Sequence, residues 1–85
     1  MRTPRQHKID RAVAEALAMV GSYLLPHEML VGDASRQVIP RPLRTEVEES
    51  IHYQEREGRI AGAPTETGAK WKLTDLGRLW LAENA

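Results

Sequence analysis

Histidine is a common metal ligand and a frequent general base, so the three histidines are the first candidates for chemistry. They are spread along the chain as His7, His27 and His52 and form no local motif. His27-Glu28 begins like the helical zinc motif of metalloproteases, but Val31 occupies the position that needs the second histidine. The sequence therefore predicts no metal site, and surface or capping roles explain these residues.

The other groups that could carry catalysis are missing or out of context. The chain has no cysteine, which excludes a thiol nucleophile and a thiolate zinc site. Its serines lie in no nucleophile elbow, and its glycines punctuate turns rather than form a phosphate-binding loop. Most carboxylates have no pocket-forming context. We therefore predict a non-enzymatic binding module that uses no cofactor.

Charged residues offer the main chemistry for binding. Twelve basic and twelve acidic residues cancel, whereas dedicated nucleic-acid binders usually show a basic excess, so the case for such a surface is local. The basic residues gather in two groups: Arg2, Arg5, Lys8 and Arg11 near the start, and Arg59, Lys70 and Lys72 further along. Lys70 and Lys72 share one face of an expected strand. They suit phosphate contacts and, equally, the protection of an edge strand from aggregation.

Residues 43–58 carry the opposite charge. Two arginines, Arg44 and Arg56, stand against five glutamates (Glu46, Glu48, Glu49, Glu55 and Glu57), a net charge of −3. If this segment is a helix with its apolar side inward, these residues point outward or sideways: Glu46, Glu48, Glu49, His52, Tyr53 and Arg56. Carboxylates at the helix start oppose phosphate binding there. They also fit a solvated, well-capped face, and tyrosine is a favoured interface anchor.

The first element that positions these residues is a helix over residues 4–20. Thr3 and Gln6 predict a capping box, and Pro4 suits the first helical position. Apolar residues then recur at the i, i+3, i+4, i+7 spacing of a helix with one buried face, and Gly21 is expected to stop it.

A shorter helix is expected from Pro26 through Val31, ending at Gly32 or within residues 33–35. Residues 37–39, bounded by prolines, predict a short edge strand or an extended link. A third helix is expected over 44–57, opened by a capping box at Thr45-Glu46-Val47-Glu48 and stopped by Gly58.

A β-hairpin follows in the sequence. Residues 59–61 and 70–73 predict two short strands around a loop at 62–69, which is longer than a tight turn and is expected to project and move. Thr74-Asp75 caps a last helix that carries Leu76, Leu79, Trp80 and Ala82. Trp71 and Trp80 are expected in the core, and Tyr23 beside the first helix.

These elements describe one domain over residues 1–85, of mostly helical α+β class. No apolar run approaches the roughly 18 residues of a membrane span, and no secretory signal is recognisable, so we expect no membrane partner and a cytoplasmic location.

Two junctions resemble those of the winged-helix superfamily of small bacterial regulators. Glu55-Arg56-Glu57-Gly58-Arg59-Ile60 looks like the passage from the third helix into the first wing strand, and Lys72-Leu73-Thr74-Asp75-Leu76-Gly77-Arg78 looks like the turn after the wing. The resemblance covers residues 9–82. It implies a winged helix with three helices, a two- to three-stranded wing hairpin and a C-terminal helix. One departure is the connection over residues 32–43, which is much longer than the usual three- or four-residue turn.

Two functions follow from this resemblance and from the charges. The preferred one is a DNA-binding regulator of transcription or accessory factor, acting as a homodimer. Arg44, Arg56, Lys70 and Lys72 would contact phosphates, and His52 or Glu48 would reach bases. The alternative is a protein-interaction winged helix that binds no DNA and docks a partner through the acidic third helix, with Glu48, Glu49 and Tyr53 in the interface.

Overall fold

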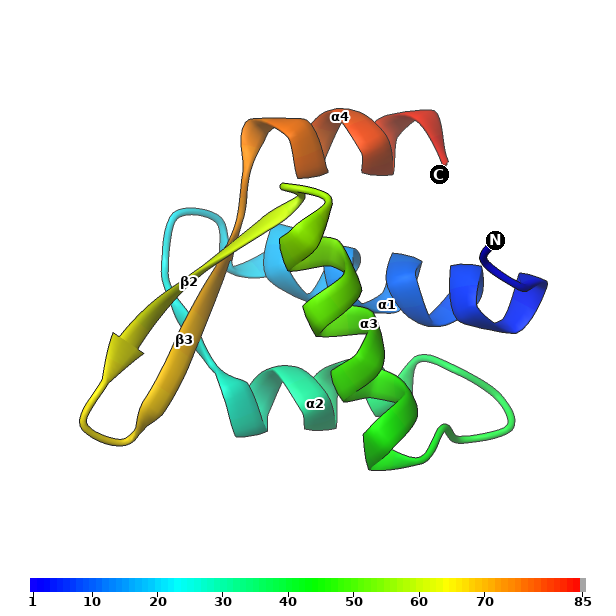
Figure 1. The fold of residues 1–85 in the computed structure, drawn as a ribbon, viewed down its shortest axis with the longest axis horizontal. Coiled ribbons are helices and arrows are strands. Elements are labelled where there is room, and N and C mark those ends of the chain that lie inside the picture. The colour runs from blue at the N-terminus through cyan, green and yellow to red at the C-terminus, as the bar shows by residue number, and fades with distance from the viewer. Residues whose placement is uncertain (85) are drawn as a thin grey trace.

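The computed structural model describes residues 1–84 and has four helices and a three-stranded antiparallel sheet (Figure 1). Helices make up 58% of the chain, so the expected mostly helical α+β class is confirmed. The elements follow one another as α1 (Pro4–Val20), β1 (Leu25–Pro26), α2 (His27–Arg36), α3 (Arg44–Arg56), β2 (Ile60–Thr65), β3 (Gly68–Leu73) and α4 (Asp75–Glu83).

Helix α1 has the predicted bounds because its start and end are set by local chemistry. The N–H of Gln6 donates to Thr3 Oγ1 at 3.1 Å, and the N–H of Thr3 donates to Gln6 Oε1 at 2.9 Å, which completes the capping box. The helix ends at Gly21, whose φ of 64° is costly for other residues.

Helix α2 differs from the prediction at both ends. Pro26 belongs to β1 and stands just before the helix. The helix ends at Arg36, one residue beyond the segment 33–35 that was the later of the two predicted ends, so Gly32 lies inside it. The buried side chains Leu30, Val31 and Ala34 continue past Gly32, so burial of this face offsets the weak helix propensity of glycine. Residues 37–39 form a turn and bend, not a strand.

Helix α3 begins one residue before the predicted cap, so the capping box at Thr45–Glu48 is wrong. Leu43 is the N-cap residue, and its N–H donates to the carboxylate of Glu46 at 3.0 Å. The end lies where Gly58 predicted it, with φ at 77°. The N–H of Gly58 donates to Glu55 O at 3.0 Å and that of Arg59 to Gln54 O at 2.9 Å, the Schellman arrangement.

The hairpin is longer and tighter than the sequence predicted. Its strands pair from Ile60↔Leu73 out to Thr65↔Gly68, so the expected loop over 62–69 is wrong and only two residues form the turn. Gly62 makes this possible, because a Cβ there would lie 2.7 Å from the Trp71 ring that crosses it. The hairpin projects away from the helices (Figure 1).

The sheet has the order β1-β3-β2, so the two-residue strand β1 and the hairpin share the central strand β3. One sheet face packs on the helices and contributes Leu73 and Trp71, the latter 4% exposed as the sequence predicted. Trp80 is half-buried and packs against this core. Tyr23 is 79% exposed, so the expectation that it packs beside α1 is wrong.

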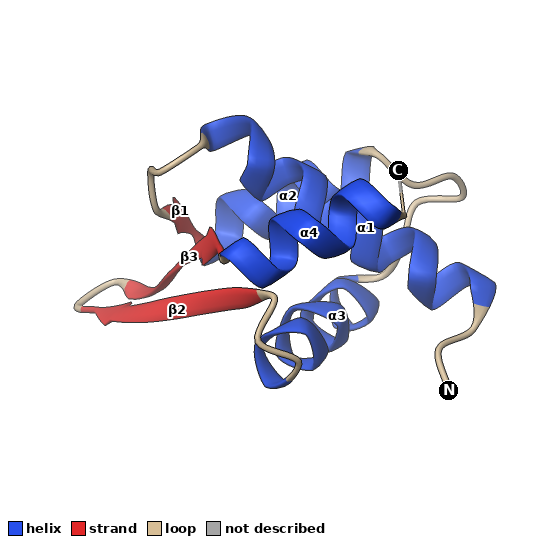
Figure 2. Ribbon diagram, turned by 90° about the horizontal axis from the view of Figure 1, so that it is seen from above, coloured by secondary structure: helices blue, strands red, loops and turns tan. Residues whose placement is uncertain are grey.

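Helix α4 has the predicted cap, because Thr74 Oγ1 accepts from the N–H of Gly77 at 3.0 Å. It packs against α1 and the base of β3, above them in the view of Figure 1 and in front of α1 in Figure 2, which is seen from above. Leu76 and Leu79 point to solvent. Within residues 1–84, no helix has the length and apolar character needed to span a bilayer.

Candidate functional site

Helix α3 presents one exposed ridge. Its inward side chains Val47, Ser50, Ile51 and Gln54 are all fully buried. The helical period therefore turns the opposite side outward, where we define the α3 ridge as the exposed residues Thr45, Glu49, His52 and Arg56. The structure thus places His52 and Arg56, two of the predicted DNA-contacting residues, on the same ridge.

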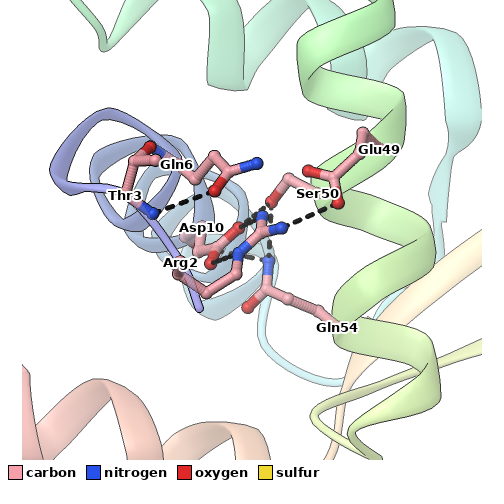
Figure 3. Close-up of polar contacts among 7 residues, drawn as sticks. All are labelled: Arg2, Thr3, Gln6, Asp10, Glu49, Ser50 and Gln54. Carbon is pink, nitrogen blue, oxygen red and sulfur yellow. Dashed lines mark hydrogen bonds and ion pairs between the residues drawn. The ribbon is translucent and has the colours of Figure 1, made fainter.

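The N-terminal segment lies against this helix through Arg2 (Figure 3). The Arg2 guanidinium donates to both carboxylate oxygens of Asp10, with Nη2 2.7 Å from Oδ1 and Nε 3.0 Å from Oδ2. Its Nη1 donates to Glu49 at 2.7 Å. The hydrogen bond from Arg2, together with its charge, holds the pKa of Glu49 below its ordinary value. Glu49 is therefore paired within the protein rather than presented as a free carboxylate.

The contact between α1 and α3 is polar at its centre. Asp10 is 1% exposed, and Ser50 Oγ donates to its carboxylate at 2.6 Å. Gln54 Nε2 donates to the backbone carbonyl of Asp10 at 3.2 Å and to Ser50 Oγ at 3.3 Å (Figure 3). Buried carboxylates need such partners, so this network fixes how α3 sits on α1.

A second arginine from the first turns of α1 neutralises the start of α3. Arg5 donates to both carboxylate oxygens of Glu46, at 2.9 Å from Nε and 3.2 Å from Nη2. The hydrogen bond from Arg5 lowers the pKa of Glu46. Arg2 and Arg5 were predicted as part of a basic N-terminal group, and in the structure both form ion pairs with α3 glutamates. Lys8 remains exposed, with no ion pair inside residues 1–84.

Glu48 is held from the other side of α3 by α2. His27 Nε2 lies 2.8 Å from Glu48 Oε2, and Arg44 Nη2 approaches the same oxygen at 3.4 Å. The hydrogen bond from His27, with the charge of Arg44, lowers the pKa of Glu48. Arg44 also donates two hydrogen bonds to Glu28, so this predicted phosphate ligand already has carboxylate partners.

The net charge of −3 counted along residues 43–58 therefore overstates how negative the surface of α3 is. The three glutamates in the first two turns each have a cationic or histidine partner from elsewhere in the fold. Glu55 and Glu57 have no ion pair within the described chain. The sequence carried no signal for these pairs, because Arg2 and Arg5 are 47 and 41 residues away from their partners.

Tyr53 is covered rather than free. The Arg2 guanidinium carbon lies 3.9 Å from the centre of its ring, and that of Arg59 lies 5.6 Å away. Arg59 also lies 4.4 Å from the Trp80 ring. These cation–π contacts join α3, the hairpin base and α4. Arg59 and Tyr53 thus act first as packing residues.

The two hairpin lysines share the outer face of β3, as predicted. Lys70 and Lys72 alternate with the buried Trp71 and face the small cross-strand neighbours Ala63 and Ala61. Lys72 is exposed and Lys70 half-buried. Neither lysine has an ion pair in the part of the chain that the structure describes. Together with Arg56 they are the predicted cations that the fold leaves available.

The ion pairs around α3 predict loss of stability in acid. Glu28, Glu46, Glu48 and Glu49 each have a pKa below the ordinary value of 4.5 in the folded chain. Such groups contribute their full stability above the unfolded pKa and lose it as the pH falls through the folded value. The urea midpoint, followed by circular dichroism, should therefore fall between pH 7 and pH 3.

Matched variants localise this effect on α3. Glu48→Gln should make the decline with pH shallower, because it removes one of the carboxylates with a lowered pKa. Glu55→Gln changes an exposed glutamate of the same helix outside the pairs and should leave the decline unchanged. A parent midpoint that stays constant from pH 7 to pH 3 would contradict the prediction.

A hollow of about 470 Å³ lies between α1 and the segment after α2, but α3 contributes none of the residues that line it. The ridge and the hairpin are therefore the surfaces on which the predicted site residues gather. Comparison of the chain with protein-family models, with curated proteins and with solved structures found no match.

Proposed function

We propose that this chain is a winged-helix domain that binds double-stranded DNA through the α3 ridge and the hairpin. The layout supports the proposal: three helices precede a projecting hairpin, and the short strand β1 between α1 and α2 pairs with β3. This agrees with the resemblance of the two junctions in the sequence. Fold likeness alone is a weak basis for function, so the surface chemistry carries the argument.

The observation that carries the proposal is the internal pairing of the α3 glutamates. Glu46, Glu48 and Glu49 would repel phosphate if they were free, but each is bound by Arg5, by His27 with Arg44, or by Arg2. Three cations outside ion pairs, Arg56, Lys70 and Lys72, supply phosphate contacts. His52 is exposed on the ridge, where it can reach a base edge.

A salt titration tests this function. Anisotropy of a labelled random duplex should rise with added protein at low salt, and the affinity should fall steeply as salt increases. Replacing Lys70 and Lys72 together with alanine should weaken binding to every sequence alike. It should also reduce the slope of log affinity against log salt by about 2, one for each phosphate contact removed.

Lys8→Ala is the matched control for charge. Lys8 is also exposed, but it lines the hollow between α1 and the segment after α2, to which neither α3 nor the hairpin contributes a residue, so its loss should leave the slope unchanged. Absence of duplex binding at low salt would sink the proposal. If Lys8→Ala reduced the slope as much as the hairpin double variant does, the binding would be non-specific attraction between charges, and the hairpin would not be a binding surface.

A protein-binding winged helix without DNA affinity remains the second candidate, and one observation favours it. Ile39 and Leu43, just before α3, are 87% and 69% exposed, and exposed apolar groups near a polar rim suit a protein interface. They are better anchors than Tyr53 and Glu49, which Arg2 already contacts. This candidate predicts no salt-dependent binding of duplex DNA.

A further inference from the structure

His27 joins the hairpin to two helices through both of its ring nitrogens. The Trp71 indole Nε1–H donates to His27 Nδ1 at 3.1 Å, and His27 Nε2 lies 2.8 Å from Glu48 Oε2. Trp71 belongs to β3, His27 opens α2 and Glu48 belongs to α3. The contact therefore ties three elements that are distant in sequence.

The chemistry of the partners fixes the protonation state of His27. An indole N–H can only donate, so Nδ1 must be unprotonated to accept it. A carboxylate can only accept, so Nε2 must carry the proton. The two bonds together hold His27 as the neutral Nε2–H tautomer. A second proton could enter only at Nδ1, where two N–H donors, those of His27 and Trp71, would then face each other without an acceptor.

Burial makes this conflict costly for the hairpin. Trp71 is 4% exposed, and a buried donor that loses its acceptor is left unsatisfied. The strand beside it offers little support, because β1 consists of Leu25 and Pro26, paired with Trp71 and Lys70. The hydrogen bond to His27 is thus a main polar tie between β3 and the start of α2.

Charged groups from neighbouring elements lie around His27. Glu48 of α3 contacts its Nε2, Arg44 of α3 contacts Glu48, and Glu28 of α2 is paired with Arg44. On β3, Lys70 and Lys72 flank Trp71 in the sequence, and both lie on the outer face of the strand. The side chain of His27 is 20% exposed, so protons from solvent have access to it.

We propose that His27 is a pH-sensitive latch between the hairpin and the helical body. Neutral His27 accepts from Trp71 and fastens β3 to α2 and α3. Doubly protonated His27 keeps the contact with Glu48 and releases Trp71, which loosens the hairpin at β1. The latch does not depend on DNA, and it adds to the function proposed above a means of changing the position of the wing.

Tryptophan fluorescence tests the latch directly. In a Trp80→Phe background Trp71 is the only tryptophan, and its emission should shift in a single transition within about pH 5–8, where histidine changes charge. Adding His27→Gln should abolish the transition. Glutamine has an oxygen to accept from the indole and an NH₂ group to donate to Glu48, but it does not titrate.

His7→Gln is the matched control, because His7 contacts Trp80 edge-on with ring centroids 5.6 Å apart and takes no part in the contacts among His27, Trp71 and Glu48. It should leave the Trp71 transition unchanged. A flat Trp71 signal across this pH range, or a transition that persists in His27→Gln, overturns the proposal.

The wild-type chain gives a second test that needs no substitution. Long-range proton–nitrogen NMR should show the Nε2–H tautomer of His27 at pH 8. The indole N–H of Trp71 should exchange with solvent faster once His27 is protonated. The Nδ1–H tautomer at pH 8, or indole exchange that does not change as His27 titrates, would refute the latch even if the variants failed to fold.

Discussion

Arg2→Met is expected to lower the free energy of unfolding by about 2–4 kcal/mol. Removing one partner of a buried ion pair costs roughly 3–5 kcal/mol because it leaves the other charge without compensation, and the residual exposure of Arg2 reduces this range. Asp10 is 1% exposed and would keep only the hydroxyl of Ser50 as a side-chain donor. Urea unfolding followed by circular dichroism at pH 7 measures the loss.

Two further variants separate the buried pair from surface charge. Arg2→Met combined with Asp10→Asn removes both charges and should cost less than the sum of the single changes. Arg36→Met breaks an exposed pair with Asp33 and should change stability by about 1 kcal/mol or less. If Arg2→Met costs no more than Arg36→Met, the contacts of Arg2 with Asp10 of α1 and Glu49 of α3 do not stabilise the fold as expected.

Gly77→Ala is the second substitution expected to have a large effect. A Cβ at Gly77 would lie 2.1 Å from the backbone oxygen of Arg59 and 2.6 Å from Leu73 Cδ1. The Arg59 carbonyl has little room to move, because it accepts from the N–H of Thr74 at 3.0 Å and from its hydroxyl at 2.9 Å. Helix α4 would have to separate from the hairpin base, at a cost of about 1–3 kcal/mol or more.

The helical glycine in α2 provides the matched control. At Gly32 a Cβ would meet only the end of the Arg36 side chain, at 3.5 Å. Gly32→Ala should therefore stabilise the protein by up to about 1 kcal/mol through helix propensity. The two glycine substitutions should thus have opposite signs in urea unfolding. Stabilisation by Gly77→Ala would mean that α4 does not pack on the hairpin base as described.

The two large effects share a physical origin that bears on the proposed function. Arg2 lies just before α1 and contacts α3, and Gly77 lies in the first turn of α4 and contacts the base of the hairpin. Cation–π contacts of Arg59 and Tyr53 connect these two junctions. Loss of either junction should lower the stability of the protein and should also disturb the surface that carries His52 and Arg56. Binding measurements on these variants therefore need a folded fraction determined under the same conditions.

The ends of several elements were predictable from sequence because capping acts over three or four residues. The Thr3/Gln6 box, Gly58 after α3 and Thr74 before α4 are all local hydrogen-bond arrangements. The prediction failed at Thr45 because the N-cap lies two residues earlier, at Leu43. The N–H of Leu43 donates to Glu46, which also binds Arg5 across the fold, and a local pattern does not record that long-range pair.

Strand lengths and the third strand depended on long-range pairing. The hairpin extends through Gly62 and Pro64 because Trp71 covers the glycine and because β2 lies at the sheet edge, where proline is tolerated. Strand β1 has only two residues and exists through its register with β3. The local pattern of residues in one segment does not indicate which other segment will pair with it as a strand.

The residue types on the candidate surface were therefore determined by the sequence, whereas their effective charge was decided by the tertiary structure. Helical periodicity placed His52 and Arg56 outward, and strand alternation placed Lys70 and Lys72 together, because both periods are properties of the backbone. Only the packing of α1 and α2 on α3 brought Arg2, Arg5 and His27 to the glutamates. Coulomb interactions depend on distance in space, so a charge counted along the chain could not anticipate them.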